Sequence, residues 1–402
     1  MYLTLSILFA LVFLYSILAG GLERSSFSGA LLFTTAGLAL GPIGLDALEL
    51  NIQTEGLKLL AELTLALVLF TDAANTNLTV LRRHIGLPLR LLLIGLPLTI
   101  FLGIGAGLLV FPGVSAVEIA LLAALLAPTD AALGKAVVTS PRVPPMLRGS
   151  LNVESGLNDG ICVPVVLSLL IIATEPETAQ SFRQLAIPLI IEELGKGAVI
   201  GVVLAWGGHH MIEFANKRGW IRETWRQITI IGLALLCFTA AQAFGGSGFI
   251  AAFVGGLVYG IYRRPYKHEF LAAAEGTGDA FALVTWVIFG AGVMGPALFL
   301  MTPEIVLYAL LSLTVVRLLP VYLALLGTDL RPVERLFVGW FGPRGLASVV
   351  FAIIVLDEAP DNVGILTATA VTTISLSVVF HGLTAKSFTR IFKKNLPKQT
   401  ET

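Results

Sequence analysis

Runs of about twenty apolar residues recur along almost the whole chain, and they limit its possible folds more than any other feature. A helix of that length is about 30 Å long and matches the hydrocarbon core of a bilayer. Inside hydrocarbon every backbone amide and carbonyl needs a partner within the protein, which leaves helices and closed barrels as spanning structures. Of the 402 residues, 56% are hydrophobic and 13% charged, and the mean hydropathy is +0.88. This composition excludes an ordinary soluble domain and predicts an all-α polytopic membrane protein.

Thirteen apolar windows can be placed as spans, and the charges between them alternate in sign. The windows are 2–20, 27–43, 56–73, 87–111, 116–138, 150–173, 187–209, 226–244, 246–262, 278–299, 303–326, 334–356 and 362–385. Lys and Arg gather in every second connection, for example Arg82 and Arg83, and in the tail 386–402. By the positive-inside rule the N-terminus is outside and the C-terminus cytoplasmic, as an odd number of spans requires.

The remaining composition points to one membrane unit. We expect a single membrane transporter domain over 1–402, in which 386–402 is a short basic cytoplasmic tail that suits the inner leaflet of a bilayer. The formal net charge is zero, which gives no indication of nucleic-acid binding. Cys162 and Cys237 lie in apolar stretches and predict neither a disulfide nor a metal cluster.

The segment 152–160 places several polar groups inside the sixth apolar window. Glu154, Ser155, Asn158 and Asp159 lie there, and Asp130 lies one helix earlier. An ionisable group at the centre of a bilayer costs about 2.5 to 3.5 kcal/mol even on the most lenient insertion scale. Such groups are retained where they form a functional site, so we interpret these residues as an ion site.

Two of the predicted helices carry proline and glycine near their middle. The fifth contains Pro128-Thr129-Asp130, and the twelfth contains Gly342-Pro343-Arg344-Gly345. Broken helices survive at membrane depth only where they face protein or a water-filled cavity, and paired breaks in two halves of a chain indicate the binding site of a transporter. The seven-span separation of the two helices predicts an inverted repeat. Asp159, Asp130, Arg344 and Arg317 all fall near mid-depth, so we expect the two breaks to meet there.

Asp, Asn, Ser and Thr supply hard oxygen ligands, which suit an alkali cation better than zinc or copper. The candidate ligands are Asp159, Asp130, Asn158, Ser155 and Thr129. A buried carboxylate can be neutralised by a proton or by a cation, and competition between the two is enough to produce exchange. Of the two adjacent residues Asn158 and Asp159, only Asp159 can titrate. This predicts that one monovalent cation replaces one proton without net charge movement. The predicted activity is transport and not enzymatic catalysis, and it needs no cofactor.

Four motifs carry a resemblance to a known family. They are Glu154-Ser155-Gly156-Leu157-Asn158-Asp159, Pro128-Thr129-Asp130, the segment 339–345, and Arg317 followed by Pro320-Val321-Tyr322. Together they resemble the motifs of NhaP-type sodium/proton antiporters, the electroneutral branch related to NHE exchangers. The resemblance implies an NhaA-like fold in which core helices within 87–173 and 303–385 move in an elevator-like way. They move against dimerisation helices within 2–73 and 187–299. It also implies Na+ as the cation, a homodimer, and a place in the bacterial inner membrane.

The resemblance also implies residue roles. Asp159 would be the carboxylate that cation and proton share, with Ser155 and Thr129 as further Na+ ligands. Asn158 would brace the unwound fifth helix through Thr129. Glu154 would pair with Arg344, while Asp130 and Arg317 would support the crossing of the two breaks.

One motif departs from the family. Many relatives have Phe-Glu-Gly at the end of the third helix, whereas this chain has Phe70-Thr71-Asp72. The acid is therefore shifted by one residue. Asp72 either reaches the ion pathway or lies in the interface near Arg82 and Arg83.

Other functions remain open at this point. Potassium/proton exchange fits the same residues, and a sodium-coupled symporter of organic anions or an uncoupled channel could use a similar fold. An intramembrane aspartyl protease is a remote alternative, because Gly276-Thr277-Gly278-Asp279 matches the GxGD pattern and Pro296-Ala297-Leu298 matches PAL. If Asp279 is not a catalytic acid, it has an N-cap or interfacial role. His381 is either a pH sensor or a plain hydrogen-bonding residue.

Overall fold

The computed structural model describes residues 2–22, 28–48, 55–75, 86–130, 133, 135–138, 140, 142–174, 178–262, 267–358, 363–390 and 392. Within these residues all regular structure is helical, which confirms the predicted all-α fold. Eight helices of this part of the chain are long and apolar enough to cross a membrane, and several shorter apolar helices accompany them. The number of thirteen crossings stays a prediction, since the shorter helices do not reach spanning length by themselves.

The N-terminal half begins with three separate helices and continues through a segment interrupted by a π-turn. The elements are α1 (Tyr2–Leu22), α2 (Gly29–Leu40), α3 (Glu55–Asn75), α5 (Gly86–Arg90), the π-turn η1 (Leu91–Gly95), α6 (Leu96–Val110), α7 (Ala116–Leu125), α8 (Lys135–Val138) and α9 (Pro145–Thr174).

The second half repeats the mixture of long helices and short interrupted ones. It contains α10 (Thr178–Lys217), α11 (Glu223–Ala243), α12 (Gly248–Ile261), α13 (Lys267–Ile288), the π-turn η2 (Phe289–Met294), α14 (Gly295–Leu298), α15 (Pro303–Leu313), α16 (Val315–Ala324), α17 (Pro332–Trp340), α18 (Leu346–Glu358) and α19 (Val363–Thr389).

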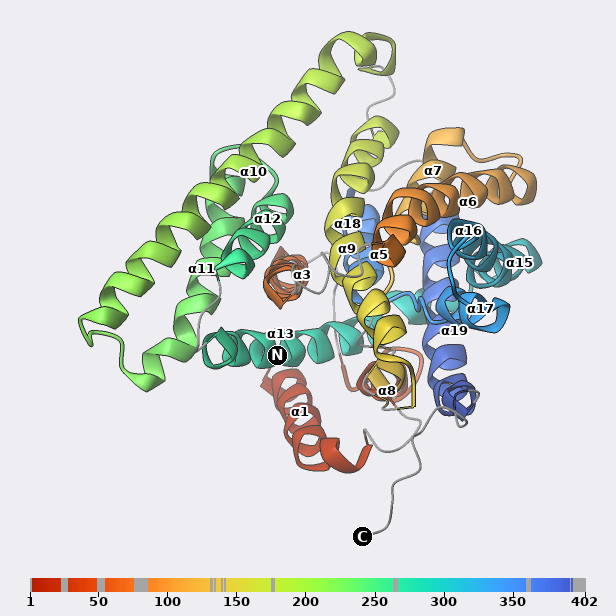
Figure 1. Ribbon diagram of the computed structural model, residues 1–402. Coiled ribbons are helices and arrows are strands. Elements are labelled where there is room, and N and C mark those ends of the chain that lie inside the picture. Colours follow the sequence, from red (N-terminus) through yellow and green to blue (C-terminus); the bar gives the residue numbers. More distant parts are fainter. Residues whose placement is uncertain are drawn as a thin grey trace.

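The helices form two groups with α3 and α9 between them (Figure 1). On one side α10, α11 and α12 pack together, and α12 also packs against α3. On the other side α6 packs against α7, α15 and α16, and α15 packs against α19. Because α9 contacts α7 as well as α3 and α12, its polar segment lies where the two groups meet.

Close packing in the interior depends on a few glycines. A Cβ on Gly160 of α9 would collide with the Phe253 ring of α12, and one on Gly256 of α12 would collide with the backbone of Phe70 in α3. Small residues let helix backbones approach closely where no water drives their association. The first contact turns the Gly160 side of α9 toward α12, and the second brings α12 close to α3.

One predicted boundary was wrong, and one predicted interruption is present. The window 278–299 starts eleven residues too late, because α13 begins at Lys267 and already contains Glu275 and Asp279. These polar residues lower the hydropathy, so hydropathy alone misplaces the start of the helix. The window 116–138 is interrupted as its proline predicts, since α7 ends at Leu125 and the next described helix, α8, begins at Lys135.

Candidate ion-binding site

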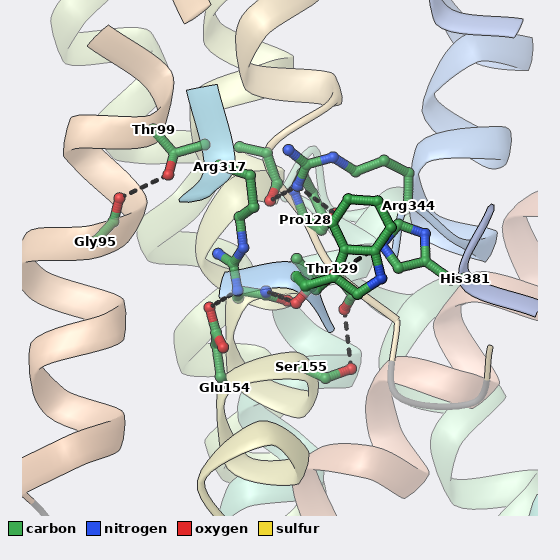
Figure 2. A network of polar contacts seen from close by, with 12 residues as sticks. Gly95, Thr99, Pro128, Thr129, Glu154, Ser155, Arg317, Arg344 and His381 are labelled. Atoms are coloured by element: carbon green, nitrogen blue, oxygen red, sulfur yellow. Dashed lines mark hydrogen bonds and ion pairs between the residues drawn. The ribbon is translucent and has the colours of Figure 1, made fainter. Parts of the chain in front are cut away.

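The two predicted breaks lie across each other in the middle of the bundle (Figure 2). Pro128 removes a backbone donor after α7, and Gly342-Pro343 does the same after α17. The Asp130 amide donates to the Pro343 carbonyl oxygen at 2.8 Å, and Arg344 Nη1 donates to the Ala127 carbonyl oxygen at 2.9 Å. Each break therefore satisfies backbone groups that the other leaves open, as the membrane interior requires.

Asp130 also caps the start of α18. Its Oδ2 atom accepts from the Leu346 amide, the first residue of α18, at 3.1 Å. Gly345 lies so close to Asp130 that a Cβ there would overlap the carboxyl group. Asp130 thus caps α18 from the unwound segment that follows α7, and Gly345 is required for its approach.

α9 holds the first break through Thr129. Ser155 Oγ donates to the Thr129 carbonyl oxygen at 2.9 Å, and Asn158 Nδ2 donates to Thr129 Oγ1 at 2.6 Å. The second contact is the brace that the family resemblance implies. All three side chains are buried, so the position of the unwound segment 128–130 is tied to the polar face of α9.

The partner of Glu154 differs from the prediction. Glu154 Oε1 lies 2.5 Å from Arg317 Nη2, and both side chains are about 2% exposed. The expected pairing with Arg344 was wrong, because the Arg344 side chain turns toward the carbonyls of the α7 break, Ala127 and Pro128. Arg317 lies in α16 and reaches α9 across the second break. There it neutralises Glu154.

Asp159 is the buried carboxyl group of the site. It is 7% exposed, and its Oδ1 atom has no hydrogen-bond partner. A cavity of about 480 Å³ reaches it, lined also by Ser155, Asp130 and Asp72. Thr129 and Asn158 are absent from the described lining residues and lie behind this wall. The structure therefore brings three of the five candidate ligands to one cavity and places the other two in its supporting layer.

The cavity holds two more acids that sequence reasoning did not assign to the site. Glu275 and Asp279 of α13 line it together with Asp72 of α3. The N-cap role considered for Asp279 was wrong, since Asp279 lies inside α13. Glu275 and Asp279 are four residues apart and share one helix face, a spacing that could have indicated a common polar surface. Thr71, which stands where relatives have glutamate, is buried and lines the cavity as well.

Two serines around the breaks were also missed. Ser348 Oγ donates to the Leu125 carbonyl oxygen at 2.8 Å, and Ser377 Oγ accepts from the Arg344 amide at 2.7 Å. Serine is common in membrane helices, so its presence alone carries no signal. Its significance comes from the broken backbone that each of these residues faces.

Two unwound helices that cross beside a buried, unpaired carboxyl group, within an apolar helical bundle, have the architecture of a membrane transporter. Comparison with known families makes this specific. The chain belongs to the sodium/hydrogen exchanger family of transmembrane proteins, whose family model matches residues 7–391. This match confirms the resemblance seen in the motifs and identifies an integral membrane protein.

Curated relatives are antiporters by name. The chain is 25% identical over 376 residues to the K+/H+ antiporter NhaP of Alkalimonas amylolytica, covering 92% of this chain and 63% of the relative. It is 29% identical over 258 residues to Na+/H+ antiporter 2 of Zygosaccharomyces rouxii, covering 60% of this chain and 31% of the relative. The chain therefore spans less than two thirds of the length of either relative.

Solved structures share the fold. The sodium proton antiporter MjNhaP1 of Methanocaldococcus jannaschii superimposes with a TM-score of 0.78 at 21% sequence identity. The match covers 94% of this chain and 98% of that one. It confirms an antiporter-type helical fold.

Proposed function

We propose that this protein exchanges a monovalent cation, sodium in the first place, for protons across a membrane. The observation that carries the proposal is the Asp159 carboxyl group, which is buried at the end of the cavity with Oδ1 unpaired. None of the described lining residues is Lys or Arg, so neutralisation of Asp159 is left to a proton or to a cation.

The buried charges around the crossing support a one-to-one exchange. Glu154 is neutralised by Arg317, and the crossing also contains one further acid, Asp130, and one further base, Arg344. Two acids and two bases balance, and Asp159 is left over. The group as a whole is neutral when Asp159 carries one proton or one monovalent cation. Moving it across hydrocarbon in any other state costs the energy of an unpaired charge.

The mechanism follows from this cost. The core helices within 87–173 and 303–385 carry Asp159 past the dimerisation helices within 2–73 and 187–299. They do so only when Asp159 is neutral. Sodium binds to Asp159 with Ser155, and the unwound segment at Thr129 adds oxygen ligands on rearrangement. Each direction of movement then needs one of the two competing ligands, so proton and cation move in opposite directions.

Asp72 has a role in this proposal as a pathway residue. Asp72 lines the cavity near the C-terminal end of α3. At 1.5 Å per residue it lies about 21 Å along the helix from Lys58, which is in the first turn. With Glu275 and Asp279 it makes the entrance acidic, which raises the local cation concentration. We place this entrance on the cytoplasmic side of a bacterial inner membrane, in a homodimer with its N-termini outside.

A potassium/proton exchanger is the second candidate, favoured by the name of the Alkalimonas relative and by oxygen ligands that suit both ions. The symporter alternative is disfavoured by the cavity. Five carboxyl groups line its described part (Asp72, Asp130, Asp159, Glu275 and Asp279), and they would repel an organic anion. The protease alternative is displaced by membership of a transporter family.

The test is transport in liposomes that contain the purified protein and an internal pH dye. Starting from an acidic interior, external sodium, potassium or lithium should drive proton efflux for the wild type and not for Asp159→Asn. Asp329→Asn is the matched control, because Asp329 is exposed in the connection before α17. An imposed membrane potential should leave the rate unchanged. Cation uptake without proton movement would overturn the proposal.

A further inference from the structure

His381 of α19 lies beside the second break and is 2% exposed. Figure 2 shows its ring next to Arg344. The Nε2 atom lies 2.8 Å from the carbonyl oxygen of Trp340, the last residue of α17. A carbonyl oxygen can only accept, so Nε2 carries a proton and donates to it. This hydrogen bond joins α19 to the end of α17, at a carbonyl oxygen that also accepts from the Gly342 amide at 2.9 Å.

The other side of the ring leads to the break itself. His381 Nδ1 lies 3.1 Å from Ser377 Oγ and 2.8 Å from the Ser377 carbonyl oxygen. Ser377 Oγ in turn accepts from the Arg344 amide at 2.7 Å. Whether Nδ1 accepts from the hydroxyl group or donates to the carbonyl, Nε2 still donates to Trp340 and Ser377 still accepts from Arg344. The arrangement therefore does not depend on the charge of the ring.

These contacts hold one peptide group of the break from both sides. The peptide between Pro343 and Arg344 accepts from the Asp130 amide through its oxygen and donates to Ser377 through its nitrogen. The Arg344 side chain then reaches the Ala127 carbonyl oxygen of the first break. A shift of α19 relative to α17 would move this peptide group and, through it, the unwound segment that carries Thr129.

We propose that His381, acting with Ser377, is a positioning residue for cation binding: its Nε2–H group fixes α17 to α19 and so sets the geometry of the crossing beside Asp159. The inference rests on the proposed cation/proton exchange. It assigns α19 to the support of the site, where sequence reasoning considered His381 only as a pH sensor or as a plain hydrogen-bonding residue.

The experiment compares three substitutions that separate the two sides of the ring. In His381→Gln the side-chain amide can place a donor near the Nε2 position, whereas in His381→Asn the shorter side chain reaches only the Nδ1 position. His381→Leu keeps volume and removes both. The half-saturating sodium concentration for proton efflux is measured together with the melting temperature. We expect the half-saturating sodium concentration to rise about tenfold in the Leu and Asn variants and to stay near the wild-type value in the Gln variant.

His210→Leu is the matched control. His210 also contacts a carbonyl oxygen four residues earlier, that of Trp206 at 2.9 Å, but it is exposed on α10. This variant should keep the wild-type sodium dependence. A purely structural role of His381 would lower the amount of folded protein and leave the half-saturating concentration unchanged.

Each outcome decides between the proposals. A wild-type protein without cation-driven proton efflux overturns the proposed function. An active wild type with equal sodium dependence in the Gln and Asn variants overturns the inference and leaves the function intact. If the Asn and Leu variants do not fold, Ser377→Ala decides, because it removes only the hydroxyl group that accepts from the Arg344 amide. An unchanged half-saturating concentration in that variant would contradict the inference.

Discussion

Glu154 and Arg317 are the two most deeply buried opposite charges that contact each other in the described structure. Taking both out of water is costly, and their attraction offsets that cost only while both remain. Glu154 Oε2 and Arg317 Nη1 have no hydrogen-bond partner, so no further hydrogen bond compensates either charge.

Replacing one partner therefore tests the pair directly. We expect Glu154→Gln to lower the free energy of unfolding by about 3 to 5 kcal/mol, because Arg317 is left buried and unpaired. Thermal unfolding in detergent measures this. Glu192→Gln is the control, since Glu192 pairs with Lys196 at 2.6 Å on an exposed face of α10. Equal melting temperatures for both variants and the wild type would show that the buried pair adds nothing to stability.

The same residues show how far a sequence predicts a site. Asp159, Asp130, Arg317 and Arg344 were placed at mid-depth from residue counts within the spans, and Glu154 was assigned to the same polar segment. Their partners were not predictable in this way. Arg344 lies in a non-helical segment, so helical periodicity does not tell where its side chain points, and Glu154 consequently meets Arg317.

Among the elements, the segment that joins α17 and α18 is held from two sides. Its backbone is satisfied by Asp130 from the unwound segment that follows α7 and by Ser377 from α19. Gly345 has no room for a side chain, because its Cβ position is filled by the Asp130 carboxyl group. The break is thus a defined structure and not a flexible joint.

An alanine at this position should disconnect the two breaks. In Gly345→Ala the new methyl group displaces Asp130 from the Leu346 amide, and we expect transport to fall by about tenfold or more. Gly105→Ala is the matched control, because its Cβ would meet no atom within 4 Å on α6. Proton efflux from liposomes with equal amounts of folded protein checks both. A normal rate for Gly345→Ala would mean that the crossing tolerates a displaced Asp130.

The sequence predicts these breaks well and their surroundings poorly. Pro128 and Pro343 each lack a backbone donor, which is a local property, so the interruptions of α7 and α17 could be located from the chain alone. The start of α13 could not, because Glu275 and Asp279 lower the hydropathy of a helix that in fact turns them toward the cavity. Which face of a helix is wet depends on its neighbours.

At the scale of the whole molecule, the two ends of α3 contact different parts of the protein. Near its last turn, Asp72 and Asn75 line the cavity that reaches Asp159. In its first turn, Lys58 forms an ion pair with Asp357 in the last turn of α18, at 2.5 Å. By the proposed division of the chain, α3 belongs to the dimerisation helices and α18 to the moving core. The pair therefore joins the two bodies on the side opposite the cavity.

Alternating access requires this ion pair to separate when the core moves. Lys58→Asp replaces attraction by repulsion and should favour the state in which the present cavity is closed. An exposed pair is worth about 0.2 to 1 kcal/mol, so the shift should be up to about fivefold. It can be measured as slower modification of the thiol introduced by Asn152→Cys, an exposed cavity position, because the native Cys162 and Cys237 are buried.

Adding Asp357→Lys to Lys58→Asp should restore the wild-type modification rate, because the attraction between α3 and α18 returns with reversed polarity. Lys196→Asp is the control. Its partner Glu192 lies on the same helix, so losing that ion pair changes no contact between the core and the dimerisation helices. A rate that is unchanged in Lys58→Asp, or that stays altered in the double reversal, would mean that closure of the outer side depends on apolar packing between α3 and α18 and not on this pair.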